Sequence, residues 1–167
     1  MNTTDILIKQ AEILADFFQK ELRTELEQQG HRDTGKLIDS IEYEILTDAD
    51  AILIVFSYLG YGDIVNDGVR PSNIPFSPNS GAKSSKYIDA LKNWAKRKGF
   101  KKPLSAAFAI AHKHKKEGMP TKGSYKFSQN GRRKYWKTFT LNQYLDKSLE
   151  IMSSDVDDLI ALILKQS

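Results

Sequence analysis

The chain has 167 residues, 40% of them hydrophobic and 28% charged, with a formal net charge of +4. This length and composition are ordinary for one globular domain that buries its own core, and they do not indicate a fibrous or disordered class. The absence of cysteine excludes disulfide frameworks, thiol catalysis and thiolate metal sites, and no apolar run approaches the roughly 20 residues that span a bilayer, so we expect a protein made and used in a cytoplasm.

The first predicted element is one long amphipathic helix that ends at Gly30. Asn2, Thr3 or Thr4 can cap it, and Asp5 suits its first turn. Its apolar residues recur at helical spacing, namely Ile6, Leu7, Ala11, Leu14, Phe18, Leu22 and Leu26. At about 1.5 Å per residue the helix would be close to 40 Å long, which is typical of a helix that also packs against a neighbouring subunit.

A β-hairpin is predicted next. Residues 31–35 form a turn, and residues 36–41 form a connector that is either helical or extended. From Ile41 the pattern alternates, and after a turn at residues 48–50 the run from Ala51 to Phe56 is rich in β-branched residues. We expect an antiparallel pair of strands with at least one buried face.

Two more helices follow an irregular, proline-containing loop from Val69 to Ala82. The first covers residues 85–98 and stops at Gly99. The second begins near Pro103, is rich in alanine and stops at Gly118, so it permits close approach of another helix.

The carboxyl-terminal third is predicted to be a polar, basic segment followed by a last helix. Residues 119–136 show no clear period, and a further strand is expected near Tyr125. The last helix covers residues 138–165, with a break at residues 153–155, where Ser and Asp are good caps. The fold class is therefore α+β, with a long N-terminal helix, a small antiparallel β-sheet and three to four further helices. Residues 1–167 form a single domain with a basic helix-pair and loop excursion at about 83–137.

Charge is strongly segregated along this chain. Between Lys83 and Lys137 there are seventeen Lys or Arg and two acids, whereas the rest of the chain has eight bases and nineteen acids. A basic surface of this size requires an anionic surface opposite it. Nucleic acid, an acidic patch on another subunit, and the acidic flanks of the same chain are all possible.

Catalytic and metal-binding patterns are sparse. None of the three histidines, His31, His112 and His114, lies in a metal-ligand motif, and we expect His112 and His114 to lie on a solvated basic helix end. Asp63 and Asp67, one helical turn apart, could share a site, but a solvated face is favoured. No nucleophile elbow or phosphate-binding loop is present. We expect no enzyme activity, cofactor or metal.

The basic segment interleaves cations with aromatic residues, a pattern that can neutralise phosphates and stack on bases. It contains no RNP, KH, zinc-finger or helix-turn-helix signature. Non-specific proximity to DNA is therefore favoured over sequence-specific reading. The remaining interpretations are a solvated basic face and a basic loop that docks on acidic residues of a like subunit.

Two segments resemble the tail-completion or head–tail joining (neck) proteins of long-tailed bacteriophages. They are Thr34-Gly35-Lys36-Leu37-Ile38-Asp39-Ser40-Ile41, before the predicted hairpin, and Tyr61-Gly62-Asp63-Ile64-Val65-Asn66-Asp67-Gly68-Val69-Arg70-Pro71, after it. The helix pair 87–99 and 106–120 is similar to an insertion found in some members. Asp67 stands where relatives usually have glutamate, and residues 137–141 lack the proline of the family's segment before the last helix. The resemblance covers Thr34 to about Leu149.

The resemblance implies a non-enzymatic homo-oligomeric ring between the DNA-filled head and the tail. It implies a virion protein that is assembled in the host bacterial cytoplasm and that contacts other head–tail connector and tail proteins. The alternative is a non-specific nucleic-acid-binding module that uses residues 83–137, and a small enzyme or toxin-like protein is a distant third. For either role, the candidate subunit-interface or DNA-facing residues are the cations Lys122, Lys126, Arg132, Arg133 and Lys134, with Tyr135 and Trp136 as apolar anchors.

Overall fold

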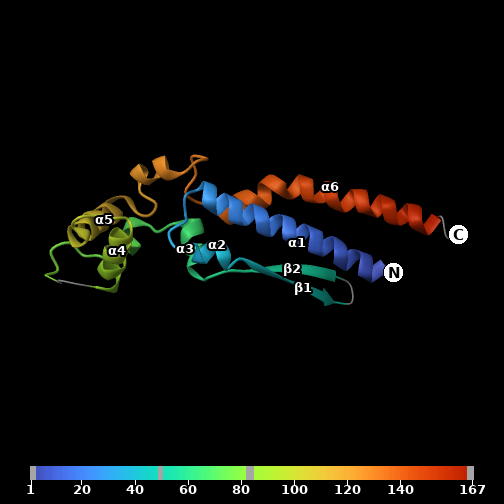
Figure 1. Cartoon of the computed structure of the whole chain (residues 1–167), viewed down its shortest axis with the longest axis horizontal. Coiled ribbons are helices and arrows are strands. Elements are labelled where there is room, and N and C mark those ends of the chain that lie inside the picture. The colour runs from blue at the N-terminus through green and yellow to red at the C-terminus, as the bar shows by residue number, and fades with distance from the viewer. Residues whose placement is uncertain (1–2, 49–50, 82–84, 165–167) are drawn as a thin grey trace. The chain divides into compact units, whose positions relative to one another are not determined.

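The computed structural model describes residues 3–48, 51–81 and 85–164 and confirms the predicted α+β class (Figure 1). The long first helix, the hairpin and the helix pair all form close to their predicted bounds. In chain order the elements are α1 (Thr3–Gln28), α2 (Lys36–Asp39), β1 (Glu42–Asp48), β2 (Ala51–Ser57), α3 (Tyr61–Asp67), η1 (Pro71–Asn73), α4 (Lys86–Arg97), α5 (Pro103–Glu117), η2 (Lys122–Phe127) and α6 (Trp136–Leu164).

The chain divides into two compact units. The first comprises Met1–Asn66 with Tyr135–Ser167, and the second comprises Asp67–Lys134. The first has eight Lys or Arg and eighteen Asp or Glu, and we call it the acidic unit; the second has seventeen and three, and we call it the basic unit. The basic unit contains most of the predicted excursion and begins earlier in the chain, at Asp67.

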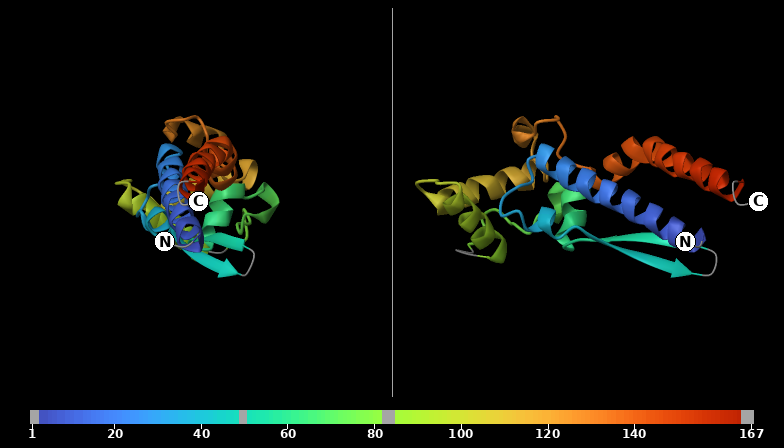
Figure 2. Two further views of the ribbon diagram at one scale, coloured as in Figure 1. Left: turned by 90° about the vertical axis from the view of Figure 1, so that its right-hand side faces the viewer. Right: turned by 45° about the vertical axis from the view of Figure 1, so that its right-hand side comes forward.

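The core of the acidic unit forms where α1 meets α2, the hairpin and α6. Its buried residues are Leu22, Leu26, Leu37, Ile38, Ile41 and Trp136. Farther along α1, the Phe17 ring meets the Tyr144 ring edge-on at 5.3 Å, so α6 runs beside α1 (Figure 2). The apolar stripe that predicted α1 is thus buried at Ala11, Phe18, Leu22 and Leu26 within the same chain, whereas Leu7 near the start of the helix is 43% exposed.

The hairpin pairs in the register Glu44↔Val55 and Leu46↔Leu53. Because side chains alternate across a strand, Tyr43, Ile45, Ile54 and Phe56 share one face. That face is half-buried, and both strands contact α1. The other face is exposed along both strands, so the predicted burial applies to one face.

The basic unit is built around the α4–α5 helix pair. Ile88, Ala107 and Ala111 are its buried centre, and Phe76 packs against them from the preceding loop. The Tyr87 hydroxyl lies 2.6 Å from His114 Nδ1 and joins the two helices. Burial raises the pKa of Tyr87 to about 12 and lowers that of His114. The prediction that His114 is solvated is therefore wrong.

A two-residue backbone ladder closes the base of the basic unit. Val69 and Met119 exchange N–H···O=C hydrogen bonds of 2.8 Å in both directions. Gly68 and Gly118 flank this ladder with φ of 75° and 82°. A Cβ at Gly118 would lie 2.5 Å from the Val69 carbonyl oxygen, so close backbone approach requires glycine there.

Two predicted features near the carboxyl terminus are wrong. Residues 122–127 form the 3-10 helix η2 instead of a strand, because the Thr121 carbonyl accepts from both the backbone N–H and the hydroxyl of Ser124. The last helix also continues through residues 153–155. The Ser153 hydroxyl donates to the Glu150 carbonyl, three residues back, so it bonds within the helix instead of capping a new one.

Candidate interaction surface

The η2 segment carries two of the predicted site residues on the surface. Lys122 and Lys126 are both exposed, and the Lys126 ammonium lies 5.0 Å from the centre of the Phe127 ring. Phe127 is 67% exposed, and Tyr125 is 39% exposed. The structure therefore brings Lys126 beside Phe127, an aromatic side chain that the predicted set did not include, and it places Lys122 in the same 3-10 helix.

The other three predicted cations lie between η2 and α6, and they are packed against the rest of that loop. Arg132, Arg133 and Lys134 are all half-buried. Burial lowers the pKa of Arg133, and the nearby Tyr125 opposes that shift. A Cβ at Gly68 would lie 2.5 Å from Lys134 Cε, so the stem of Lys134 packs against the Gly68 backbone. These three cations are less accessible than Lys122 and Lys126.

The two predicted apolar anchors have opposite surroundings. Tyr135 is 55% exposed, with φ of 62°, whereas Trp136 is fully buried in the core of the acidic unit. Trp136 Nε1–H donates to the Gly62 carbonyl at 3.1 Å, and its ring meets Tyr58 edge-on. A side chain with no exposed surface cannot contact another molecule, so we withdraw Trp136 from the candidate surface and keep Tyr135.

Polar contacts fix the start of α6 beside Trp136. The buried Asn66 accepts the Lys137 N–H on its side-chain oxygen at 3.1 Å. Lys137 Nζ lies 2.5 Å from the Asp63 carboxylate and 2.7 Å from the Tyr58 hydroxyl. These bonds lower the pKa of Asp63 and raise that of Lys137. These hydrogen bonds connect α6 to α3, and we assign a structural role to the residues that make them.

A second cationic surface lies at the turn between α4 and α5. Lys96, Arg97, Lys98, Lys101 and Lys102 are all exposed there. Phe100 in this turn and Leu104 at the start of α5 are 47% and 45% exposed. The sequence signal was available, because five cations fall within seven residues around Gly99, but the predicted set stopped at the later basic segment.

A metal-binding cluster and a membrane-spanning helix are both absent from the part of the chain that the structure describes. Among the side chains that the structure describes, no group of three or more His, Asp or Glu is placed to hold a metal ion. Among the described helices none is long and apolar enough to cross a membrane.

Comparison with known proteins gave no match. No protein-family model matches the chain, and neither do any curated protein sequences or solved structures.

Proposed function

We propose that this chain is a structural subunit of a phage neck, forming a ring of identical copies that joins the DNA-filled head to the tail. The proposal starts from the sequence resemblance over residues 34–149. In this role the chain is a virion component that catalyses no reaction and is assembled in the host cytoplasm. Its partners are further copies of itself and other connector and tail proteins.

One observation carries the proposal. The division of charge coincides with the division of the fold, because seventeen of the twenty-five cations lie in the basic unit and eighteen of the twenty-one acids lie in the acidic unit. When one surface of each copy contacts a different surface of the next copy, the series continues from copy to copy. It closes into a ring when the rotation between neighbouring copies allows it. Opposite charges on the two surfaces set orientation and register.

Exposed apolar side chains support an assembled state. Leu141, Leu145 and Leu149 repeat every four residues along α6, and each is at least 45% exposed. Leu46, Leu53 and Val55 are exposed on the hairpin. Contiguous apolar patches of this kind mark protein–protein contacts in soluble proteins.

A particle-assembly experiment tests the proposal directly. Deletion of the gene from its phage should give DNA-filled heads and free tails that do not join, and a plasmid copy should restore joining. Mass spectrometry of purified wild-type virions should find the chain in multiple copies. Normal tailed particles from the deletion phage would contradict the proposed role.

A nucleic-acid-binding module is the second candidate, favoured by the exposed cations and aromatic rings of η2. It predicts binding to DNA of arbitrary sequence, with an affinity that falls steeply as salt is raised. Lys122→Glu/Lys126→Glu should weaken that binding and reduce its salt dependence. A chain that stays monomeric at high concentration and binds DNA tightly would favour this candidate over the ring.

A further inference from the structure

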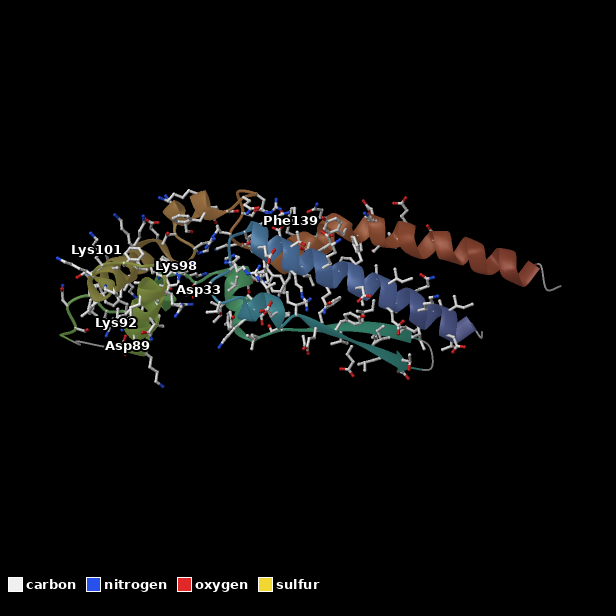
Figure 3. All side chains as sticks on the ribbon, in the orientation of Figure 1. Asp33, Asp89, Lys92, Lys98, Lys101 and Phe139 are labelled. Carbon is white, nitrogen blue, oxygen red and sulfur yellow. The ribbon has the colours of Figure 1, made fainter. Side chains whose placement is uncertain are left out.

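The turn between α4 and α5 combines apolar side chains with cations. We call residues 98–104 the basic tip. Its Phe100 and Leu104 are about half exposed, and Lys98, Lys101 and Lys102 are exposed around them. Figure 3 labels Lys98 and Lys101 in this turn. Exposure of phenylalanine and leucine to water is unfavourable, and contact surfaces commonly have an apolar centre with a charged rim. The basic tip has this composition.

The backbone holds the basic tip in a defined shape. The Phe100 N–H donates to the Ala95 carbonyl at 3.0 Å, and Gly99 adopts φ of 75° at the end of α4. The Phe100 ring lies 5.9 Å from the Trp94 ring, which restricts its motion. A preformed surface of this kind loses little conformational entropy when it binds a partner.

The exposed face of the hairpin also has exposed apolar side chains, but the charged residues beside them are acidic. We call it the outer sheet face. Leu46 and Leu53 are directly opposed across the two strands and are 43% and 53% exposed, and Val55 is 43% exposed. The same face carries Glu42, Glu44 and Asp48, which are all exposed. It therefore presents apolar side chains on both strands beside a row of carboxylates along β1.

We propose that the basic tip of one copy docks on the outer sheet face of a second copy, with Phe100 and Leu104 against Leu46, Leu53 and Val55. Lys101 and Lys102 then face Glu42 and Glu44. The inference rests on the proposed ring, for which it names the contacting surfaces. Because the two surfaces differ, each copy both gives and receives one contact, and the series can close on itself.

A second copy fits these surfaces better than nucleic acid does. A polyanion would neutralise the basic tip, but it would leave the apolar outer sheet face uncovered and would be repelled by its carboxylates. A like subunit covers both apolar centres and neutralises both rims. The contact is also specific, since two basic tips or two outer sheet faces repel each other.

A charge-exchange experiment tests this contact in the full-length chain. Lys101→Glu/Lys102→Glu and Glu42→Lys/Glu44→Lys each place like charges on both sides of the contact. Each variant alone should therefore associate at least tenfold more weakly than wild type in sedimentation velocity. An equimolar mixture should regain association, because each variant then supplies the surface that the other requires.

Two matched variants control for general charge effects. Lys113→Glu/Lys116→Glu reverses two exposed cations of α5 outside the tip, and Asp146→Lys/Glu150→Lys reverses two exposed acids beside the leucines of α6. Both should associate as wild type does. If the α6 variant loses association and the hairpin variant keeps it, the contact lies on α6 and the proposal is overturned. Circular dichroism of every variant verifies that the helices are retained.

Cross-linking gives a second, independent readout because the natural chain has no cysteine. Leu53→Cys and Leu104→Cys chains, mixed and treated with a short bismaleimide, should form a covalent heterodimer. Leu141→Cys in place of Leu53→Cys should not. A monomeric cross-linked product from the double variant L53C/L104C, with no heterodimer from the mixture, would show that the surfaces meet within one chain and would overturn the proposal.

The outcomes separate this contact from the ring itself. If wild type assembles and neither charge variant is affected, the basic tip is not at the contact, and the ring proposal stands on other surfaces. If wild type shows no association at any concentration and the deletion phage joins heads to tails, both proposals fail together.

Discussion

The acidic and basic units are built by different means. The acidic unit buries large side chains, with Trp136, Leu26 and Ile41 fully excluded from solvent. The basic unit has a core centred on Ile88 and two alanines, Ala107 and Ala111, and it is closed by the Val69–Met119 backbone ladder. Apolar burial therefore contributes more to the acidic unit, whereas close helix approach and backbone bonds are more important in the basic unit.

The charge difference follows from the same division. The basic unit has fourteen more cations than acids, and the acidic unit has ten more acids than cations. Repulsion within each unit opposes compactness and is reduced when an oppositely charged surface is adjacent. In the proposed ring, contact between unlike units would therefore stabilise both, and the basic unit, with its smaller core, would gain more.

Loss of Trp136 should produce the largest effect and should fall on the acidic unit. Trp136→Ala removes a fully buried ring and leaves the Gly62 carbonyl without its indole donor. We expect a loss of about 3–5 kcal/mol in the free energy of unfolding. Hydrogen exchange followed by mass spectrometry should show faster exchange in peptides from α1, α2 and α6 than in those from α4 and α5.

The neighbouring Tyr135 supplies the matched control. Tyr135→Ala truncates an aromatic side chain that is 55% exposed, so its effect on stability should be within about 0.5 kcal/mol. Equal losses from the two substitutions would contradict the assignment of Trp136 to the core and of Tyr135 to the surface.

Overpacking the small-residue core should affect the basic unit in the complementary way. Ala107→Leu adds volume where α5 packs on Ile88 and Phe76, and it should cost about 1–3 kcal/mol. Ala109→Leu, at an exposed position two residues along the same helix, should be nearly neutral. Faster hydrogen exchange should be confined to α4 and α5. An effect spread evenly over both units would show that they unfold as one.

A smaller effect is expected at the start of α4. The Ser85 hydroxyl accepts the Ile88 N–H at 3.2 Å and so caps the helix. Ser85→Ala should cost about 1 kcal/mol, and Ser85→Asp, which retains an acceptor, should restore most of it. Hydrogen exchange of the first turn of α4 measures both. If Ser85→Ala and Ser85→Asp exchange alike, the cap makes no measurable contribution.

The sequence predicted most of the secondary structure because its signals are local. Helical spacing, the glycines at 30, 99 and 118, and the β-branched run after residue 50 each act over a few residues. The errors arose where a side chain had two local options. Ser153 bonds back into its own helix, and Ser124 helps to form a turn where a strand was expected.

The site was less predictable because exposure depends on long-range contacts. Tyr135 and Trp136 are adjacent aromatic residues in one basic segment, and their different surroundings follow from α6 meeting α3 some seventy residues earlier in the chain. The sequence prediction placed both residues on the surface because both are aromatic and lie in the same basic segment. The charge division was visible in the sequence, but its coincidence with two folded units required the structure.

The smallest predicted effect concerns pH and the contact of α6 with α3. Bonds from Lys137 and Tyr58 lower the pKa of Asp63 below its ordinary value of 3.8. This carboxylate therefore stabilises the folded chain fully above about pH 4 and loses that contribution as pH falls through its folded pKa. Lys137, whose pKa is raised above 10.5, keeps its contribution until the pH rises through that higher value.

Asp63→Asn should therefore lower stability slightly at pH 7, and the difference from wild type should shrink below about pH 4 as the native carboxylate is protonated. Urea denaturation across that pH range measures the difference. Asp146→Asn, which removes an exposed carboxylate of α6, controls for the loss of one negative charge. A difference that is the same at pH 7 and pH 3 would mean that the negative charge of Asp63 does not contribute to stability. The contact between α6 and α3 would then depend on Trp136 and Asn66. Burial of side chains would account for nearly all of the stability of the acidic unit.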